Sequence, residues 1–119
     1  MSAKRVLVVE DDEPTQKLIE ALMKRDGHAP TIASTATEAL SLLGESEFDV
    51  IVLDLMMPRV AGTTVIEVLE EQQRRTPIVV CSAAGTSLLD RIGGGLVHAV
   101  VRKPFDIDEL SAAVMSAMR

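Results

Sequence analysis

Short runs of apolar, mostly β-branched residues alternate along this chain with longer segments in which apolar residues recur at helical spacing. Residues 6–9, 50–53 and 78–81 are continuous apolar runs, as expected for strands that are covered on both faces. A weaker run at residues 31–33 and another at 97–101 complete a set of five predicted strands.

The first segment of helical period follows the first strand. Pro14 suits the first turn of a helix, and Gly27 marks its end. The apolar stripe that we expect to face the core consists of Leu18, Ile19, Leu22 and Met23.

Four more helices are predicted between and after the later strands. Thr35 and Glu38 form a capping box that opens the second helix, and residues 62–63 lead into the third. A short fourth helix around residues 88–92 stops at three consecutive glycines, and Asp106 with Glu109 caps the last helix. The residues expected to face inward are Ala39, Leu40, Leu42 and Leu43 in the second helix, Val65, Ile66, Val68 and Leu69 in the third, and Leu110, Ala113, Val114 and Ala117 in the last.

The alternation of strands and helices predicts the fold class. Residues 1–119 contain five strand–helix units, with no internal repeat and no low-complexity linker, so we expect a single domain. Right-handed crossovers then give an α/β, doubly wound, five-stranded parallel sheet with five helices, flavodoxin-like, in the strand order 2-1-3-4-5. In such sheets ligands bind at the carboxyl ends of the strands, near the switch between the first and third strands.

Composition narrows the classes of function. A net charge of −6 and a pI near 4.8 argue against direct binding to nucleic acid, and no apolar stretch is long enough to span a membrane. Cys81 is the one cysteine and lies in an apolar run, which indicates an inert buried thiol and a reducing, cytoplasmic location. His28 and His98 lack a second histidine at metal-ligand spacing, so we expect exposed or packing roles for both.

Polar residues follow four of the predicted strands at one edge of the sheet. Glu10 and Asp11 follow the first strand, Asp54 the third, Ser82 the fourth and Lys103 the fifth. Clustered carboxylates repel one another and attract a cation, and hard oxygen ligands with room for water suit Mg²⁺. A carboxylate can also act as a nucleophile toward phosphorus, with the ammonium and hydroxyl groups holding phosphoryl oxygens. The combination predicts phosphoryl transfer to Asp54.

These residues resemble the signature of the response-regulator receiver family, in its order and spacing and over essentially the whole chain. The matching stretches are residues 6–12, 49–58, 62, 82–83 and 103–105.

The resemblance implies a role for each site residue. Asp54 would be the phosphoacceptor, and Ser82 and Lys103 would contact the phosphoryl oxygens. The metal, Mg²⁺, would be held by Asp54 itself, by the carboxylate of Asp11, by Glu10 through water and by the backbone carbonyl of Met56. Pro58 and Gly62 would shape the loop after the acceptor, and Asp12 would be a spectator.

The resemblance also implies a function in a two-component system or phosphorelay. The domain would take a phosphoryl group from the phosphohistidine of a sensor histidine kinase or a histidine phosphotransfer protein. It would then change its binding to a downstream protein. It would catalyse only its own phosphorylation and dephosphorylation, so we do not expect a conventional enzyme.

The chain departs from the family pattern in several places. Val100 stands where the family often has an aromatic residue, and residues 86–98 are glycine-rich and slightly short. We therefore expect activation to change backbone order between residues 86 and 97 more than side-chain position at Val100. Ser82 stands where threonine is commoner. Met56 and Ala84 occupy the positions that flank the approach of water in the family, and neither can orient a water molecule, which predicts a long-lived phosphorylated form.

Two other classes of function compete with this interpretation. Residues 11–15 faintly resemble the nucleophile motif of haloacid-dehalogenase-type phosphohydrolases, in which case Asp11 would carry the phosphoryl group. A receiver-like scaffold could also bind partners without phosphorylation. Two observations separate the three classes: which residue becomes phosphorylated, and whether any Mg²⁺-dependent phosphorylation occurs.

Overall fold

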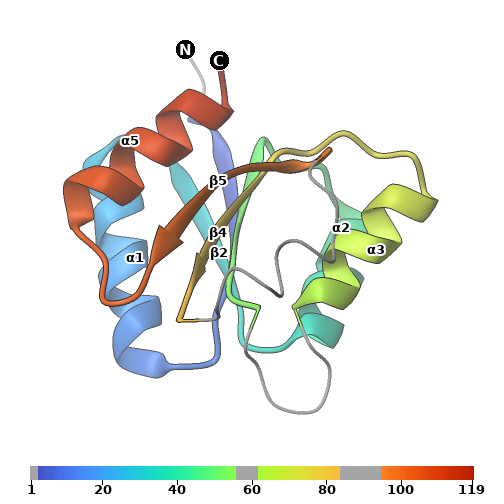
Figure 1. Cartoon of the computed structure of the whole chain (residues 1–119), viewed down its shortest axis with the longest axis horizontal. Helices are drawn as coiled ribbons and strands as arrows, with labels where there is room; N and C mark the ends of the chain where they lie inside the picture. The colour runs from blue at the N-terminus through green and yellow to red at the C-terminus, as the bar shows by residue number, and fades with distance from the viewer. Residues whose placement is uncertain (1–2, 56–61, 84–94) are drawn as a thin grey trace.

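The computed structural model describes residues 3–55, 62–83 and 95–119, which form a parallel sheet covered on both faces by helices (Figure 1). The strands are β1 (Arg5–Val9), β2 (Ala29–Ala33), β3 (Val50–Leu53), β4 (Ile78–Ser82) and β5 (Val97–Arg102). The helices are α1 (Glu13–Arg25), α2 (Ala36–Glu45), α3 (Thr63–Glu71) and α5 (Ile107–Ala117). The strand order is β2-β1-β3-β4-β5, which confirms the predicted topology.

The alternation of side chains along β1 divides the core into two layers. Val6 and Val8 face α1 and α5, whereas Leu7 and Val9 face α2 and α3, because successive side chains of a strand point to opposite faces of the sheet. All four side chains are fully buried, as are those of β3 and β4. This double coverage explains why these strands are continuously apolar in sequence.

The apolar stripe of α1 is narrower than the sequence predicts. Ile19, Leu22 and Met23 are buried, but Leu18 is 48% exposed, so its predicted burial is wrong. Ile19 lies about one turn before Leu22 and Met23, on the side of α1 that faces the sheet. Leu18 lies at the edge of that side, about 100° round the helix from Ile19, and lines the same small hollow as Ile107 at the start of α5. In α2, α3 and α5 the predicted inward residues are buried or partly buried.

Side-chain caps begin three of the helices. Asp12 caps α1, a role that the sequence analysis did not assign to it, Thr35 caps α2 and Asp106 caps α5. The Thr35 hydroxyl accepts the Glu38 amide at 3.0 Å, as predicted, but the Glu38 carboxylate accepts the amide of Ser34 rather than that of Thr35. Gly27 follows α1 with φ +85°, a conformation that favours glycine and explains the predicted helix end.

The predicted fourth helix around residues 88–92 lies outside the described residues, so four of the five predicted helices are observed in the part of the chain that the structure describes. None of these helices combines the length and the hydropathy that a membrane crossing requires.

Candidate phosphoacceptor and metal site

Backbone hydrogen bonds of the sheet position the polar residues that follow the strands. The Glu10 amide donates to the Ala33 carbonyl at 3.0 Å, and the Asp54 amide donates to the Val9 carbonyl at 3.0 Å. The Lys103 amide donates to the Ser82 carbonyl at 3.2 Å. Each of these residues therefore extends the parallel ladder by one step, and their side chains meet at the carboxyl edge of the sheet.

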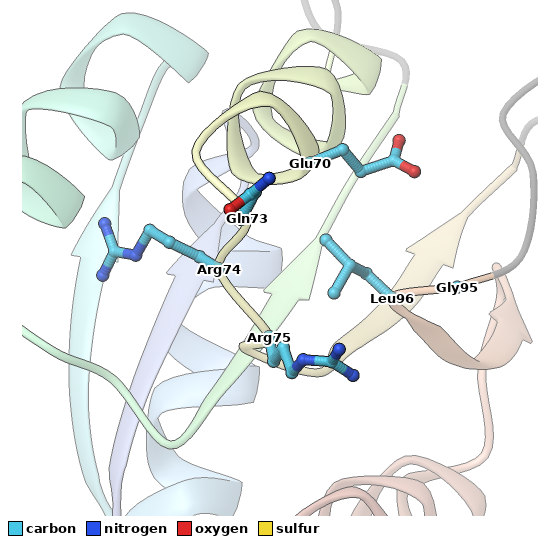
Figure 2. Close-up of a pocket in the computed structure, with 6 residues that line it drawn as sticks. All are labelled: Glu70, Gln73, Arg74, Arg75, Gly95 and Leu96. Carbon is cyan, nitrogen blue, oxygen red and sulfur yellow. The ribbon is translucent and has the colours of Figure 1, made fainter.

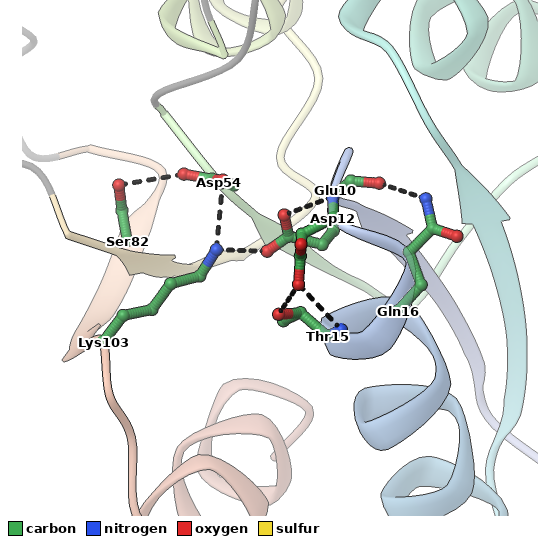
Figure 3. A network of polar contacts seen from close by, with 7 residues as sticks. All are labelled: Glu10, Asp12, Thr15, Gln16, Asp54, Ser82 and Lys103. Carbon is green, nitrogen blue, oxygen red and sulfur yellow. Dashed lines mark hydrogen bonds and ion pairs between the residues drawn. The ribbon is translucent and has the colours of Figure 1, made fainter.

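The carboxylate of Asp54 belongs to a polar network drawn in Figure 3 and contacts Ser82 and Lys103 there. The Ser82 hydroxyl donates to Asp54 Oδ1 at 3.0 Å, and Lys103 Nζ donates to Asp54 Oδ2 at 3.1 Å. Asp54 is 5% exposed and Ser82 is 2% exposed, so both groups are largely removed from water. The structure thus brings together the three residues that the sequence predicts for the phosphoryl site.

Lys103 also pairs with Glu10, a contact that the sequence analysis did not predict. Lys103 Nζ donates to Glu10 Oε1, and the amide of Asp12 donates to Glu10 Oε2 at 3.0 Å (Figure 3). Both oxygens of a carboxylate that is only 1% exposed are therefore engaged. A buried carboxylate requires such partners, because leaving its charge unpaired is costly.

The two ends of this ion pair have shifted pKa values. Burial raises the pKa of Glu10 above its ordinary value, because it disfavours the charged form more than the bonds from Lys103 and Asp12 favour it. Burial would also favour the neutral form of Lys103. The carboxylates of Glu10 and Asp54 outweigh that effect and raise the pKa of the Lys103 ammonium. Lys103 therefore stays positively charged at neutral pH.

Three carboxylates gather at this edge and could hold a metal ion. Glu10, Asp11 and Asp54 each offer one oxygen, and these oxygens lie within 4.8 Å of one another. Carboxylate oxygens are the hard ligands that Mg²⁺ prefers, so the chemistry of this donor set fits that ion. With Lys103 as the only ammonium in the described network, three negative charges face one positive charge. A divalent cation would balance the two negative charges that are left.

Asp11 and Asp12 are adjacent but have different environments. The Asp12 carboxylate accepts hydrogen bonds from the hydroxyl and the amide of Thr15, which lower the pKa of Asp12. The Asp12 carboxylate is therefore engaged as the N-terminal cap of α1. The exposed Asp11, in contrast, belongs to the acidic cluster with Glu10 and Asp54. This difference supports the predicted register of the acidic triplet.

Gln16 is a further residue of the network that the sequence analysis missed. Its side-chain amide donates to the backbone carbonyl of Glu10 (Figure 3). The same amide donates to the Ser34 hydroxyl at 3.1 Å. A glutamine in the first turn of a helix has no distinctive sequence signal, so only the fold reveals these contacts.

Several predicted residues are not part of the described network. Met56, Pro58 and Ala84 lie outside the described residues. Val100 is 42% exposed on β5. His98 is exposed, as expected, and hydrogen-bonds Ser116 Oγ at 2.9 Å.

Cys81 is buried in β4. Its burial raises the pKa of the thiol to about 12, which agrees with the prediction of an inert side chain.

A hollow of about 480 Å³ adjoins the network at Lys103. Its lining residues are Thr15, Leu18, Ala83, Lys103, Pro104 and Phe105.

A second hollow, of about 600 Å³, lies at the opposite edge of the sheet, near the starts of β4 and β5 (Figure 2). Arg74 borders this second hollow, but its side chain extends toward α2 and donates to the Leu43 carbonyl at 2.7 Å. Arg74 therefore links the segment between α3 and β4 to α2 and does not extend the phosphoacceptor site.

Comparison with known proteins agrees with this architecture. The family model for the response regulator receiver domain matches residues 6–115. The transcriptional regulatory protein YkoG of Bacillus subtilis is 31% identical over 121 residues, a match that covers 100% of this chain and 53% of YkoG. The transcriptional activator PfeR of Pseudomonas aeruginosa is 33% identical over 97% of this chain and 38% of its own length. The chain thus spans about half or less of these relatives.

Solved structures show the same fold. The receiver domain of the Francisella response regulator 1452 has a TM-score of 0.88 and 32% identity, and the match covers 97% of this chain and 96% of that domain. A CheY-like receiver domain from Methanospirillum hungatei reaches a TM-score of 0.90 at 20% identity, over 98% and 94% of the two chains, and supports the fold alone. With a family match over nearly its whole length and the expected strand order, this chain belongs to the response-regulator receiver family of two-component systems.

Proposed function

We propose that this receiver domain accepts a phosphoryl group on Asp54 in a Mg²⁺-dependent reaction. The observation that carries the proposal is the placement of one buried carboxylate, Asp54, between the Lys103 ammonium and the Ser82 hydroxyl, beside two further carboxylates. One Asp54 oxygen would form a bond to phosphorus while the bond between phosphorus and the donor breaks, and the donor leaves with the electron pair of that bond.

The residues around Asp54 would bind the oxygens of the transferred phosphoryl group and neutralise their charge. Lys103 Nζ and Ser82 Oγ already contact different oxygens of Asp54, so each can donate to a different oxygen of a phosphoryl group attached there. The metal, held by Asp11 and Asp54 with Glu10 nearby, would neutralise charge on the phosphoryl oxygens. The Met56 carbonyl is proposed as a further ligand by family resemblance alone.

We propose a phosphohistidine of a sensor kinase or of a histidine phosphotransfer protein as the donor. The hollow beside Lys103 would give such a donor access to the site, and the apolar side chains of Leu18 and Phe105 that line it are a surface that a protein partner could cover. Phosphorylation would then change binding to a downstream protein. YkoG and PfeR are named as transcriptional regulators. This chain carries a net charge of −6, so in such proteins we expect DNA to be bound by the part of the relative that this chain does not match.

Labelling with acetyl phosphate and Mg²⁺ tests the proposal. Intact-mass and peptide mass spectrometry should place one phosphoryl group on Asp54, and chelation of the metal should abolish the label. Asp54→Asn should remove labelling, whereas the matched variant Asp12→Asn, which preserves a capping side chain, should be labelled like the parent protein. Full modification of Asp54→Asn at another residue would contradict the assignment.

The same experiment separates the competing functions. Label on Asp11 with continuous release of phosphate would indicate a phosphohydrolase. The contacts of Lys103 and Ser82 with Asp54 favour Asp54 instead. No labelling of the folded protein under any Mg²⁺ concentration would indicate a binding module that works without phosphorylation.

A further inference from the structure

The side chain of Gln16 lies where it can control the orientation of the metal-binding loop. β1 ends at Val9 and α1 begins at Glu13, so Glu10, Asp11 and Asp12 make the whole connection between them. The Glu10 carbonyl belongs to the peptide unit that joins Glu10 to Asp11. Gln16 donates to this carbonyl from the first turn of α1.

A peptide unit is planar, so fixing its carbonyl fixes the direction in which the next residue leaves it. The Glu10 amide is already held by the Ala33 carbonyl at 3.0 Å, and Asp12 is held by its contacts with Thr15. The bond from Gln16 fixes the remaining freedom, which is rotation of the peptide plane between Glu10 and Asp11. The direction of the exposed Asp11 side chain depends on that plane.

Ser34 extends this control to a second loop. Gln16 donates to the Ser34 hydroxyl at 3.1 Å, and the Ser34 amide donates to the Glu38 carboxylate at 3.2 Å. The connection from β2 to α2 is therefore tied to the connection from β1 to α1 by one glutamine side chain. These contacts are distinct from those of Lys103 and Ser82, which hold Asp54 from the other side of the site.

We infer that Gln16 is a positioning residue for the metal site, which orients the peptide between Glu10 and Asp11 and so sets the affinity of the acidic cluster for a divalent cation. The inference rests on the proposed function, because it assumes that this cluster binds Mg²⁺. It predicts an effect on metal affinity and none on the transfer step once metal is saturating.

Titration of bound Mn²⁺ by electron paramagnetic resonance, and of Mg²⁺ by amide NMR shifts, measures the affinity directly. Gln16→Met keeps the length of the side chain and removes its donor. It should weaken metal binding about fivefold, the factor that corresponds to one net hydrogen bond. The apparent Mg²⁺ constant for labelling by acetyl phosphate should rise by the same factor, with the rate at saturating Mg²⁺ unchanged. Lys17→Ala, at an exposed neighbouring position, is the matched control and should leave the affinity unchanged.

Ser34→Ala gives an independent test should Gln16→Met fold poorly. It should weaken metal binding by a smaller factor, and it should add nothing in the Gln16→Met background, because both changes act through the same amide. Metal affinities of Gln16→Met and Ser34→Ala equal to that of the parent would overturn the inference while leaving the proposed function intact. Failure of the parent protein itself to bind Mn²⁺ or Mg²⁺ would overturn both.

Discussion

The glycine that precedes α3 offers a sharp test of how closely the backbone packs behind the phosphoacceptor. Gly62 has φ −59°, which any residue adopts, so its identity is not required by its conformation. A Cβ atom at this position would lie 2.2 Å from the carbonyl oxygen of Asp54 and 2.9 Å from the Cα atom of Leu55. Both atoms belong to the backbone, which cannot rotate away as a side chain can.

Gly62→Ala should therefore displace the chain at Asp54 and destabilise the domain. Overpacking a tightly packed site costs about 1–3 kcal/mol, and a urea dependence of about 1.5 kcal/mol per M converts the middle of that range to a midpoint lower by roughly 1 M. Because the chain has no Trp or Tyr, far-UV circular dichroism is the suitable probe of unfolding. The rate of labelling by acetyl phosphate should also fall, because the displaced carbonyl belongs to the acceptor residue.

Gly44→Ala is the matched control. Gly44 lies in α2, and an added Cβ atom there meets nothing within 4 Å, so alanine should stabilise the helix by up to about 0.5 kcal/mol. The two substitutions are chemically identical and should have opposite signs. Equal urea midpoints for Gly62→Ala and Gly44→Ala would refute the close approach of Gly62 to the Asp54 backbone.

Three further predictions address the site and the core. Asp11→Ala should weaken Mn²⁺ binding at least about tenfold with little change in melting temperature. Asp12→Ala should lower the melting temperature through the lost cap and weaken metal binding far less than Asp11→Ala does, and equal losses of affinity would contradict the register of the triplet. With a thiol pKa of about 12, Cys81 is about one part in ten thousand thiolate at pH 8, so a disulfide reagent should label it in urea but not in the native protein, and rapid native labelling would contradict its burial. The isolated phosphoprotein should be long-lived if Met56 and Ala84 cannot orient water, and a half-life of only seconds would disprove this.

Much of the fold follows from local patterns in the sequence. The five predicted strands coincide with the observed ones to within a few residues. For β1, β3 and β4 the reason is burial on both faces, which leaves an unbroken apolar run, whereas the edge strands β2 and β5 are only partly buried and their runs are weaker. Thr35 and Asp106 mark helix starts by accepting amides two or three residues away, and Pro14 does so through its own fixed backbone angle. Their roles can therefore be predicted without knowledge of the fold. The edge at which Asp54, Ser82 and Lys103 meet also follows, since parallel strands share one carboxyl edge.

Which atoms meet at that edge was decided by the tertiary structure. Lys103 pairs with Glu10 across 93 positions of the chain, and the choice depends on how far each side chain reaches within the assembled sheet. The exposure of Leu18 depends on which side of α1 faces the sheet and on the position of α5, neither of which the helical period specifies. The contacts of Gln16 with Glu10 and Ser34 arise because two loops, each after a different strand, lie side by side only once β1 and β2 have paired. Local periodicity specifies elements and their ends, whereas contacts between distant side chains depend on distances that exist only in the folded sheet.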